Sequence, residues 1–90
     1  MNRNKMNIKM DLLRVAKTAL DTKNEFDTQV SKEFLDKAKK EFLLIEDEEK
    51  DLLSVLESHY DEMDEIKNDP EKRVKWGEKI MTIASRLSIN

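Results

Sequence analysis

Hydrophobic residues recur every three or four positions along most of this chain, which is the repeat of amphipathic α-helices. The longest stretch with this repeat runs from residue 31 to residue 67. On a helical wheel, one narrow sector of its first half holds Val30, Phe34, Ala38, Phe42 and Ile45. After six charged residues, the same sector continues with Leu52, Leu56, His59, Tyr60, Met63 and Ile66. The pattern therefore predicts either one long helix or two consecutive helices.

The segment from Glu46 to Asp51 decides between these alternatives. It is entirely charged, and Asp47 can act as the N-cap of a third helix. A single helix over the 37 residues 31–67 would span about 55 Å, which exceeds the width of a compact chain of this size. We therefore favour a break near residue 46, with one continuous helix over 31–67 as the alternative.

Two further stretches have helical spacing. The first runs over residues 5–22, where one stripe holds Ile8, Leu12, Val15, Ala16 and Ala19 and is widened by Leu13 and Leu20. The last begins at Pro70, because proline suits a first helical turn and Asp69 is a good N-cap. Its residues Trp76, Ile80, Ile83 and Leu87 are spaced like a coiled-coil seam. Gly77 and Ala84 are small enough to let a neighbouring helix approach closely.

These patterns predict helices over residues 5–22, 31–45, 47–67 and 70–88, with Ser31 as the N-cap of the second. The expected fold is all-α, a single-domain antiparallel bundle of three to four helices. One glycine and one proline in 90 residues disfavour a turn-rich β fold. Phe34 and Trp76 are expected in the core. The first and last helices carry more apolar surface than a small bundle can cover, which suits a homodimer or a groove for a partner helix.

The residue types exclude most site chemistry. Without cysteine there is no disulfide framework and no thiolate metal site, and one glycine cannot build a glycine-rich phosphate loop. The carboxylates lack the spacing of a calcium loop or of a di-iron bundle site. His59, the single histidine, is expected at the core boundary, bonded to a carboxylate or a backbone oxygen. We therefore expect no enzyme, no metal and no cofactor.

Charge is distributed unevenly along the chain. The net charge is −3, but residues 46–69 hold eleven acidic and two basic residues, a net charge of −9. In a compact bundle, the basic flanking segments would largely neutralise this segment. If they do not, the carboxylates form a negative ridge that can steer a basic partner. A basic stripe on the last helix, formed by Lys72, Lys75, Lys79 and Arg86, leaves nucleic-acid association as a weaker alternative.

The expected function is that of a small, non-enzymatic protein-binding module: a regulator, inhibitor or adaptor that binds another protein. The expected steering residues are Asp51, Asp61, Glu62 and Glu65, and the expected apolar anchors are Leu43, Leu44 and Met81. The alternative is a structural or assembly protein that homodimerises through its first and last helices. No apolar run approaches the roughly 20 residues of a membrane span, and no secretory signal is visible. A cytoplasmic location without membrane association is therefore expected.

Overall fold

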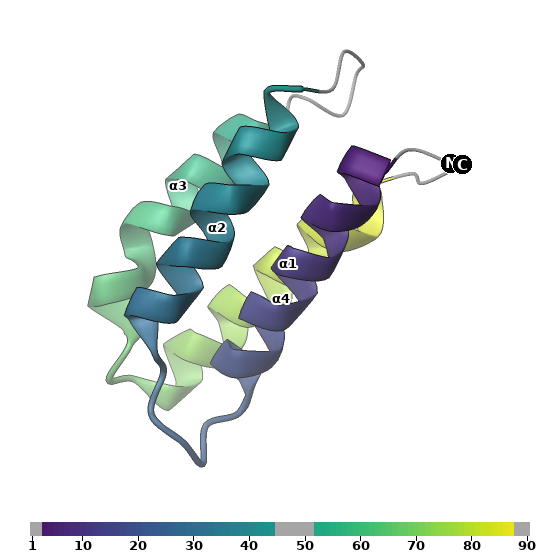
Figure 1. Ribbon diagram of the computed structural model, residues 1–90. Coiled ribbons are helices and arrows are strands. Elements are labelled where there is room, and N and C mark those ends of the chain that lie inside the picture. Colours follow the sequence, from purple (N-terminus) through teal and green to yellow (C-terminus); the bar gives the residue numbers. More distant parts are fainter. Residues whose placement is uncertain (1–2, 45–51, 88–90) are drawn as a thin grey trace.

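The computed structural model describes residues 3–44 and 52–87, and within these ranges the chain forms four α-helices and no strand. The helices are α1 (Arg3–Leu20), α2 (Thr28–Phe42), α3 (Leu52–Ile66) and α4 (Pro70–Arg86). Each helix packs against two others, because α1 and α3 both contact α2 and α4. Successive helices run antiparallel, so that α1 begins at the end of the bundle where α4 finishes (Figure 1). The predicted all-α antiparallel bundle is confirmed.

The long central stretch forms two helices that lie side by side (Figure 1). α2 ends at Phe42, and the chain reverses direction before α3 begins at Leu52. The alternative of one continuous helix over residues 31–67 is therefore wrong. The predicted break near residue 46 and the predicted cap at Asp47 lie outside the described residues.

The beginning of α2 differs from the prediction. Asp27, not Ser31, is the N-cap, and its carboxylate accepts a hydrogen bond from the backbone N–H of Val30 at 3.1 Å. Aspartate caps helices as well as serine does, and here it starts the helix earlier in the chain. Ser31 then falls inside α2 on the buried side, where it is 2% exposed. The predicted boundaries 31–45 are corrected to Thr28–Phe42.

The boundaries of α1 and α4 lie closer to the prediction, and α3 ends at Ile66, one residue before its predicted end, while its predicted start at residue 47 lies outside the described residues. α1 begins and ends two residues before the predicted range 5–22. α4 begins at Pro70 as predicted, and the Asp69 carboxylate accepts a hydrogen bond from the backbone N–H of Lys72 at 3.2 Å. This helix ends at Arg86, and residue 88, its predicted end, lies outside the described residues.

The core receives one face of every helix, but the face of α2 is rotated from the predicted one. Trp76 is 1% exposed, as expected for a core residue. On α2, however, Leu35 is fully buried, Phe34 is only partly buried, and Val30 is 43% exposed. The buried residues of α2 are Ser31, Leu35, Ala38 and Phe42, which keep the four- and three-residue spacing of one helix face, turned away from Val30. The outer part of the Phe34 ring lies under the Arg14 guanidinium, whose carbon is 5.6 Å from the ring centre.

α1 and α4 approach each other closely at Gly77, as its small size predicted. A Cβ atom at Gly77 would lie 3.0 Å from Cγ of Leu20 and 3.3 Å from the carbonyl oxygen of Ala16. Ala84, seven residues later in α4, is also fully buried. The two small residues therefore allow α4 to rest directly against the backbone of α1.

Candidate functional site

The predicted docking residues occupy three separate parts of the bundle. Leu43 and Leu44 follow the last turn of α2 and are 63% and 65% exposed. Met81 lies on α4, where it borders a groove shared with α1. The acidic members of the set that the structure describes all lie on α3: Asp61, Glu62 and Glu65. Asp51 lies outside the described residues. The structure therefore does not unite the predicted residues on one surface.

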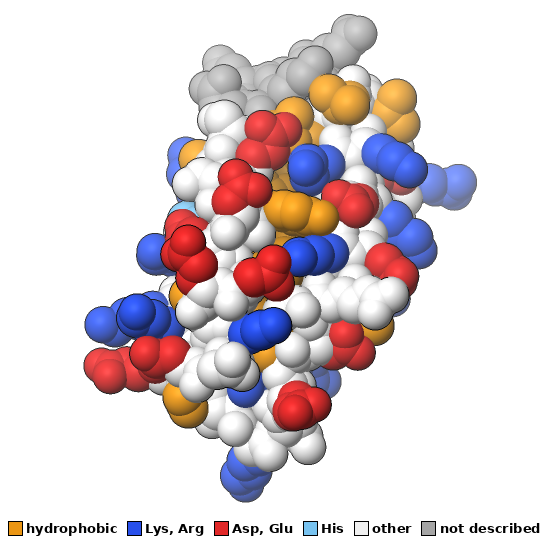
Figure 2. All heavy atoms as spheres, turned by 90° about the vertical axis from the view of Figure 1, so that its left-hand side faces the viewer, with side chains coloured by type: hydrophobic (Ala, Val, Ile, Leu, Met, Phe, Trp, Pro, Cys, Tyr) orange, Lys and Arg blue, Asp and Glu red, His pale blue; other side chains and the backbone are white. Residues whose placement is uncertain are grey.

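The acidic residues of α3 are partly neutralised by lysines of the neighbouring helices. Lys32 of α2 forms an ion pair with Asp64 at 2.9 Å, and this hydrogen bond raises the pKa of Lys32 and lowers the pKa of Asp64. From α4, the Lys79 ammonium lies 3.9 Å from a Glu62 carboxylate oxygen. Figure 2 shows lysine and arginine side chains among the carboxylates on the face formed by α2 and α3. Two of the α3 carboxylates are thus paired with lysines of α2 and α4, as expected for a solvated helix face.

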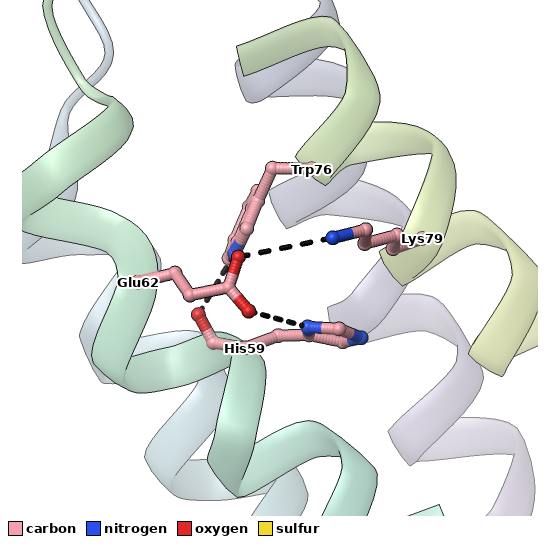
Figure 3. Close-up of polar contacts among 4 residues, drawn as sticks. All are labelled: His59, Glu62, Trp76 and Lys79. Atoms are coloured by element: carbon pink, nitrogen blue, oxygen red, sulfur yellow. Dashed lines mark hydrogen bonds and ion pairs between the residues drawn. The ribbon is translucent and has the colours of Figure 1, made fainter. Parts of the chain in front are cut away.

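His59 belongs to a small polar cluster between α3 and α4 (Figure 3). Its Nδ1 atom lies 3.2 Å from Oε1 of Glu62, whose other oxygen faces Lys79. The indole N–H of Trp76 donates a hydrogen bond to the His59 carbonyl oxygen at 2.8 Å. The His59 side chain is 14% exposed, which agrees with the predicted boundary position. The cluster connects the two helices and satisfies the polar atom of the buried tryptophan.

Arg73, which sequence reasoning did not single out, is buried in α4 at 4% exposure. Its guanidinium donates to the carbonyl oxygens of Asn24 at 2.9 Å, Asp21 at 3.0 Å and Thr18 at 3.1 Å. It also lies over the Phe26 ring, 5.3 Å from the ring centre. The cation thus donates to carbonyl oxygens in the last turn of α1 and in the loop that follows it, where the negative end of the helix dipole favours a positive charge. The available signal was its spacing, because Arg73 precedes the core residue Trp76 by three positions.

Asp11 is the buried carboxyl group of the contact between α1 and α2. It is 8% exposed, and burial raises its pKa, although Arg14 and Lys37 oppose this effect. The Arg14 guanidinium lies 3.2 Å from the Asp11 carboxylate. The adjoining hollow has a volume of about 440 Å³ and is also lined by Lys40 and Glu41. Cationic groups from both helices therefore compensate the buried charge only in part.

α1 has a second apolar face that points away from the core. Its inner face is fully buried at Ile8, Leu12, Val15 and Ala19. A second series has the same alternation of four- and three-residue steps, and we call it the outer seam: Met6, Met10, Leu13, Lys17 and Leu20. Met10 is 46% exposed and Leu13 is 40% exposed, whereas Met6 and Leu20 are half-buried. This spacing is that of a coiled-coil seam, whose side chains insert between those of a facing helix.

α4 forms one wall of the outer seam. Leu13, Leu20 and Met81 line a groove of about 480 Å³ together with Lys17 and Asp21. Met81 is 43% exposed. The close approach at Gly77 places α4 directly beside Leu20, which is why a residue from each helix reaches the same groove. Sequence reasoning identified Met81 but not Leu13 or Met10 as docking residues, although their four- and three-residue spacing was visible.

The outer seam is basic as well as apolar. α1 contains five basic residues and one acidic residue, Asp11, which packs toward α2. Lys17 lies within the seam, and Lys9 lies beside it. Asp21, at the end of the groove, accepts a hydrogen bond from the Asn24 side chain at 2.8 Å. A helix docked along the seam would therefore meet apolar side chains interrupted by positive charge.

Compared with known proteins, the chain matches no family model, no curated protein and no solved structure. Across residues 3–44 and 52–87, none of the helices combines the length and the apolar character needed to cross a membrane. The same part of the chain holds no group of three or more histidine, cysteine, aspartate or glutamate side chains placed to bind a metal.

Proposed function

We propose that the chain is a small, non-enzymatic protein-binding module whose docking surface is the outer seam of α1 together with Met81 of α4. The observation that carries this proposal is the exposure of Leu13 and Met81 at an apolar groove, with the exposed Met10 one helical turn before Leu13 on α1. The exposed part of these side chains adds nothing to the stability of the free bundle, whereas its burial in a complex contributes about 25 cal/mol per Å². Contiguous apolar surface of this kind is typical of interaction sites.

The composition of the seam suits a helical partner. Met6, Met10 and Met81 have flexible side chains that can adapt to the shape of an incoming surface. Leu13 and Leu20 lie seven residues apart, so an apolar stripe on the partner can contact both. In this proposal the seam supplies affinity, and the exposed carboxylates of Asp61 and Glu65 contribute only to steering. Leu43 and Leu44 are not part of this docking surface, because they lie after α2 and do not line the groove between α1 and α4.

A matched pair of double variants tests the docking surface. The double variant Leu13→Ser with Met81→Ser removes apolar surface from the seam, and Val30→Ser with Val55→Ser removes similarly exposed groups from α2 and α3. Circular dichroism should show both variants folded, because each substitution replaces a side chain that is more than a third exposed and leaves the fully buried core unchanged. In affinity capture from extracts of the native host, we expect the first variant to lose the partner retained by the second. Equal capture by the two variants would contradict the proposed surface.

A further inference from the structure

We infer that the occupant of the outer seam is an amphipathic helix with carboxylates beside its apolar stripe. This inference rests on the proposed docking surface and adds the chemistry of the partner. The observation behind it is that Lys17, a positively charged residue, lies within the apolar seam. In coiled-coil terms, Met6, Leu13 and Leu20 occupy one set of positions in the outer seam, and Met10 and Lys17 occupy the alternating set.

Lys17 determines what the facing helix must supply. It lies one helical turn from both Leu13 and Leu20 and lines the groove with them. A helix that covers the two leucines therefore covers the stem of Lys17 as well. The ammonium group at the end of this stem then lies at the edge of the contact, where a counter-charge stabilises it and a like charge repels it. A carboxylate on the partner, next to its apolar stripe, provides that counter-charge.

The flanks of the seam repeat this requirement. Lys9 lies on one side of the seam, next to Met10, and Arg14 lies on the other side, next to Leu13. The Arg14 guanidinium already bonds Asp11 at 3.2 Å but remains largely exposed, with 54% of its side-chain surface accessible. Charged residues at such flanking positions set partner choice and orientation in coiled coils. The positive flanks therefore select a partner helix with negative flanks.

The same charges disfavour a second copy of α1 as the occupant. In a two-fold contact each surface meets itself. Parallel pairing would bring Lys17 against Lys17, and antiparallel pairing would bring it against Leu13 or Leu20. The single carboxylate of α1, on Asp11, packs toward α2, and Asp21 after the helix already bonds Asn24. Self-pairing of α1 would thus place Lys17 opposite another lysine or a leucine rather than opposite a carboxylate.

Two synthetic peptides test the inference directly. Each has about three heptads with leucine at the seam positions, and the flanking positions are all glutamate in one and all lysine in the other. Like-charged flanks keep each peptide from pairing with itself. In fluorescence anisotropy with the full chain, we expect the acidic peptide to bind at least about tenfold more tightly than the basic one. Its affinity should fall as salt screens the flanking charges.

Lys17→Glu and Lys67→Glu provide a matched pair of charge reversals. Lys67 is exposed in the connection between α3 and α4 and is not among the residues that line the groove. We expect Lys17→Glu to weaken binding of the acidic peptide about tenfold and Lys67→Glu to leave it within about twofold. Retention of full affinity by Lys17→Glu would overturn the inference.

The remaining outcomes separate this inference from the proposed function. One outcome is that both peptides bind equally and independently of salt, and that the double variant Leu13→Ser with Met81→Ser loses this binding. That result would overturn the inference that the partner helix is acidic and would retain the proposed docking surface. Binding of neither peptide, with a light-scattering mass about twice 10.6 kDa, would identify a second copy as the occupant and overturn the inference. Binding of neither peptide by a monomeric chain would contradict both proposals.

Discussion

Asp11 shows how a single buried carboxyl group makes the stability of the bundle depend on pH. Burial raises its pKa, so the folded chain holds this proton more tightly than the unfolded chain does. The group therefore contributes to stability in acid, below its unfolded pKa, and that contribution is lost as pH rises through the folded pKa. At neutral pH the buried carboxylate carries a desolvation cost that Arg14 and Lys37 offset only in part.

Asp11→Asn should accordingly stabilise the protein at pH 7, because the amide fills the same space without a charge. Urea unfolding at several pH values measures this effect. The gain in unfolding free energy should shrink toward pH 3, where Asp11 is protonated in both states. Asp36→Asn, at an exposed position of α2, is the control and should change little. A gain that is independent of pH would show that the charge of Asp11 is not the cause.

At the scale of elements, Arg73 fastens the end of α1 to α4. Its buried guanidinium donates hydrogen bonds to the carbonyl oxygens of Thr18, Asp21 and Asn24, so a neutral side chain at this position removes three polar contacts between α4 and the end of α1. Arg73→Met should therefore cost about 3 kcal/mol, a large share of the total stability expected for a small domain. Arg73→Lys should cost less, because it keeps the charge but offers fewer fixed donors.

Denaturant unfolding followed by circular dichroism checks this prediction. Lys72→Ala, one residue earlier in α4 and exposed, serves as the control and should stay within about 0.5 kcal/mol of the parent. Arg73→Met would refute the proposed role if it were as stable as this control. The exposed fraction of Arg73 and its three backbone acceptors distinguish it from the surface lysines on the same helix.

α2 and α4 show how far the sequence could predict individual elements. The start of α4 was predictable because Asp69 and Pro70 act locally, through the first turn alone. The start of α2 was not, because Asp27 and Ser31 are both good caps and the burial of Ser31 depends on tertiary packing. The exchange of Phe34 for Leu35 at the centre of the buried face has the same origin. Periodicity locates a stripe, but the neighbouring helices determine its centre.

At the scale of the whole molecule, the helical class and the antiparallel arrangement could be predicted from periodicity and breaks. The surface could not, because it depends on which helices become neighbours. The acidic residues of α3 suggested a ridge, but Lys32, thirty-two positions before Asp64 in the chain, pairs with that residue in the bundle. Likewise, Met81 gains its significance from Leu13 and Leu20 across the groove. Long-range packing is thus the reason why the proposed docking surface lies on α1 and α4 and not on the acidic helix α3.

One measurement tests most directly whether α1 is buried on one face and open on the other. A soluble gadolinium chelate broadens the methyl signals of accessible side chains in an NMR spectrum. The chain should be studied at a concentration where light scattering gives 10.6 kDa. We predict that the signals of Leu13, Met10 and Met81 broaden strongly while those of Leu12 and Val15 persist. Equal protection of the adjacent residues Leu12 and Leu13 would contradict an outer seam.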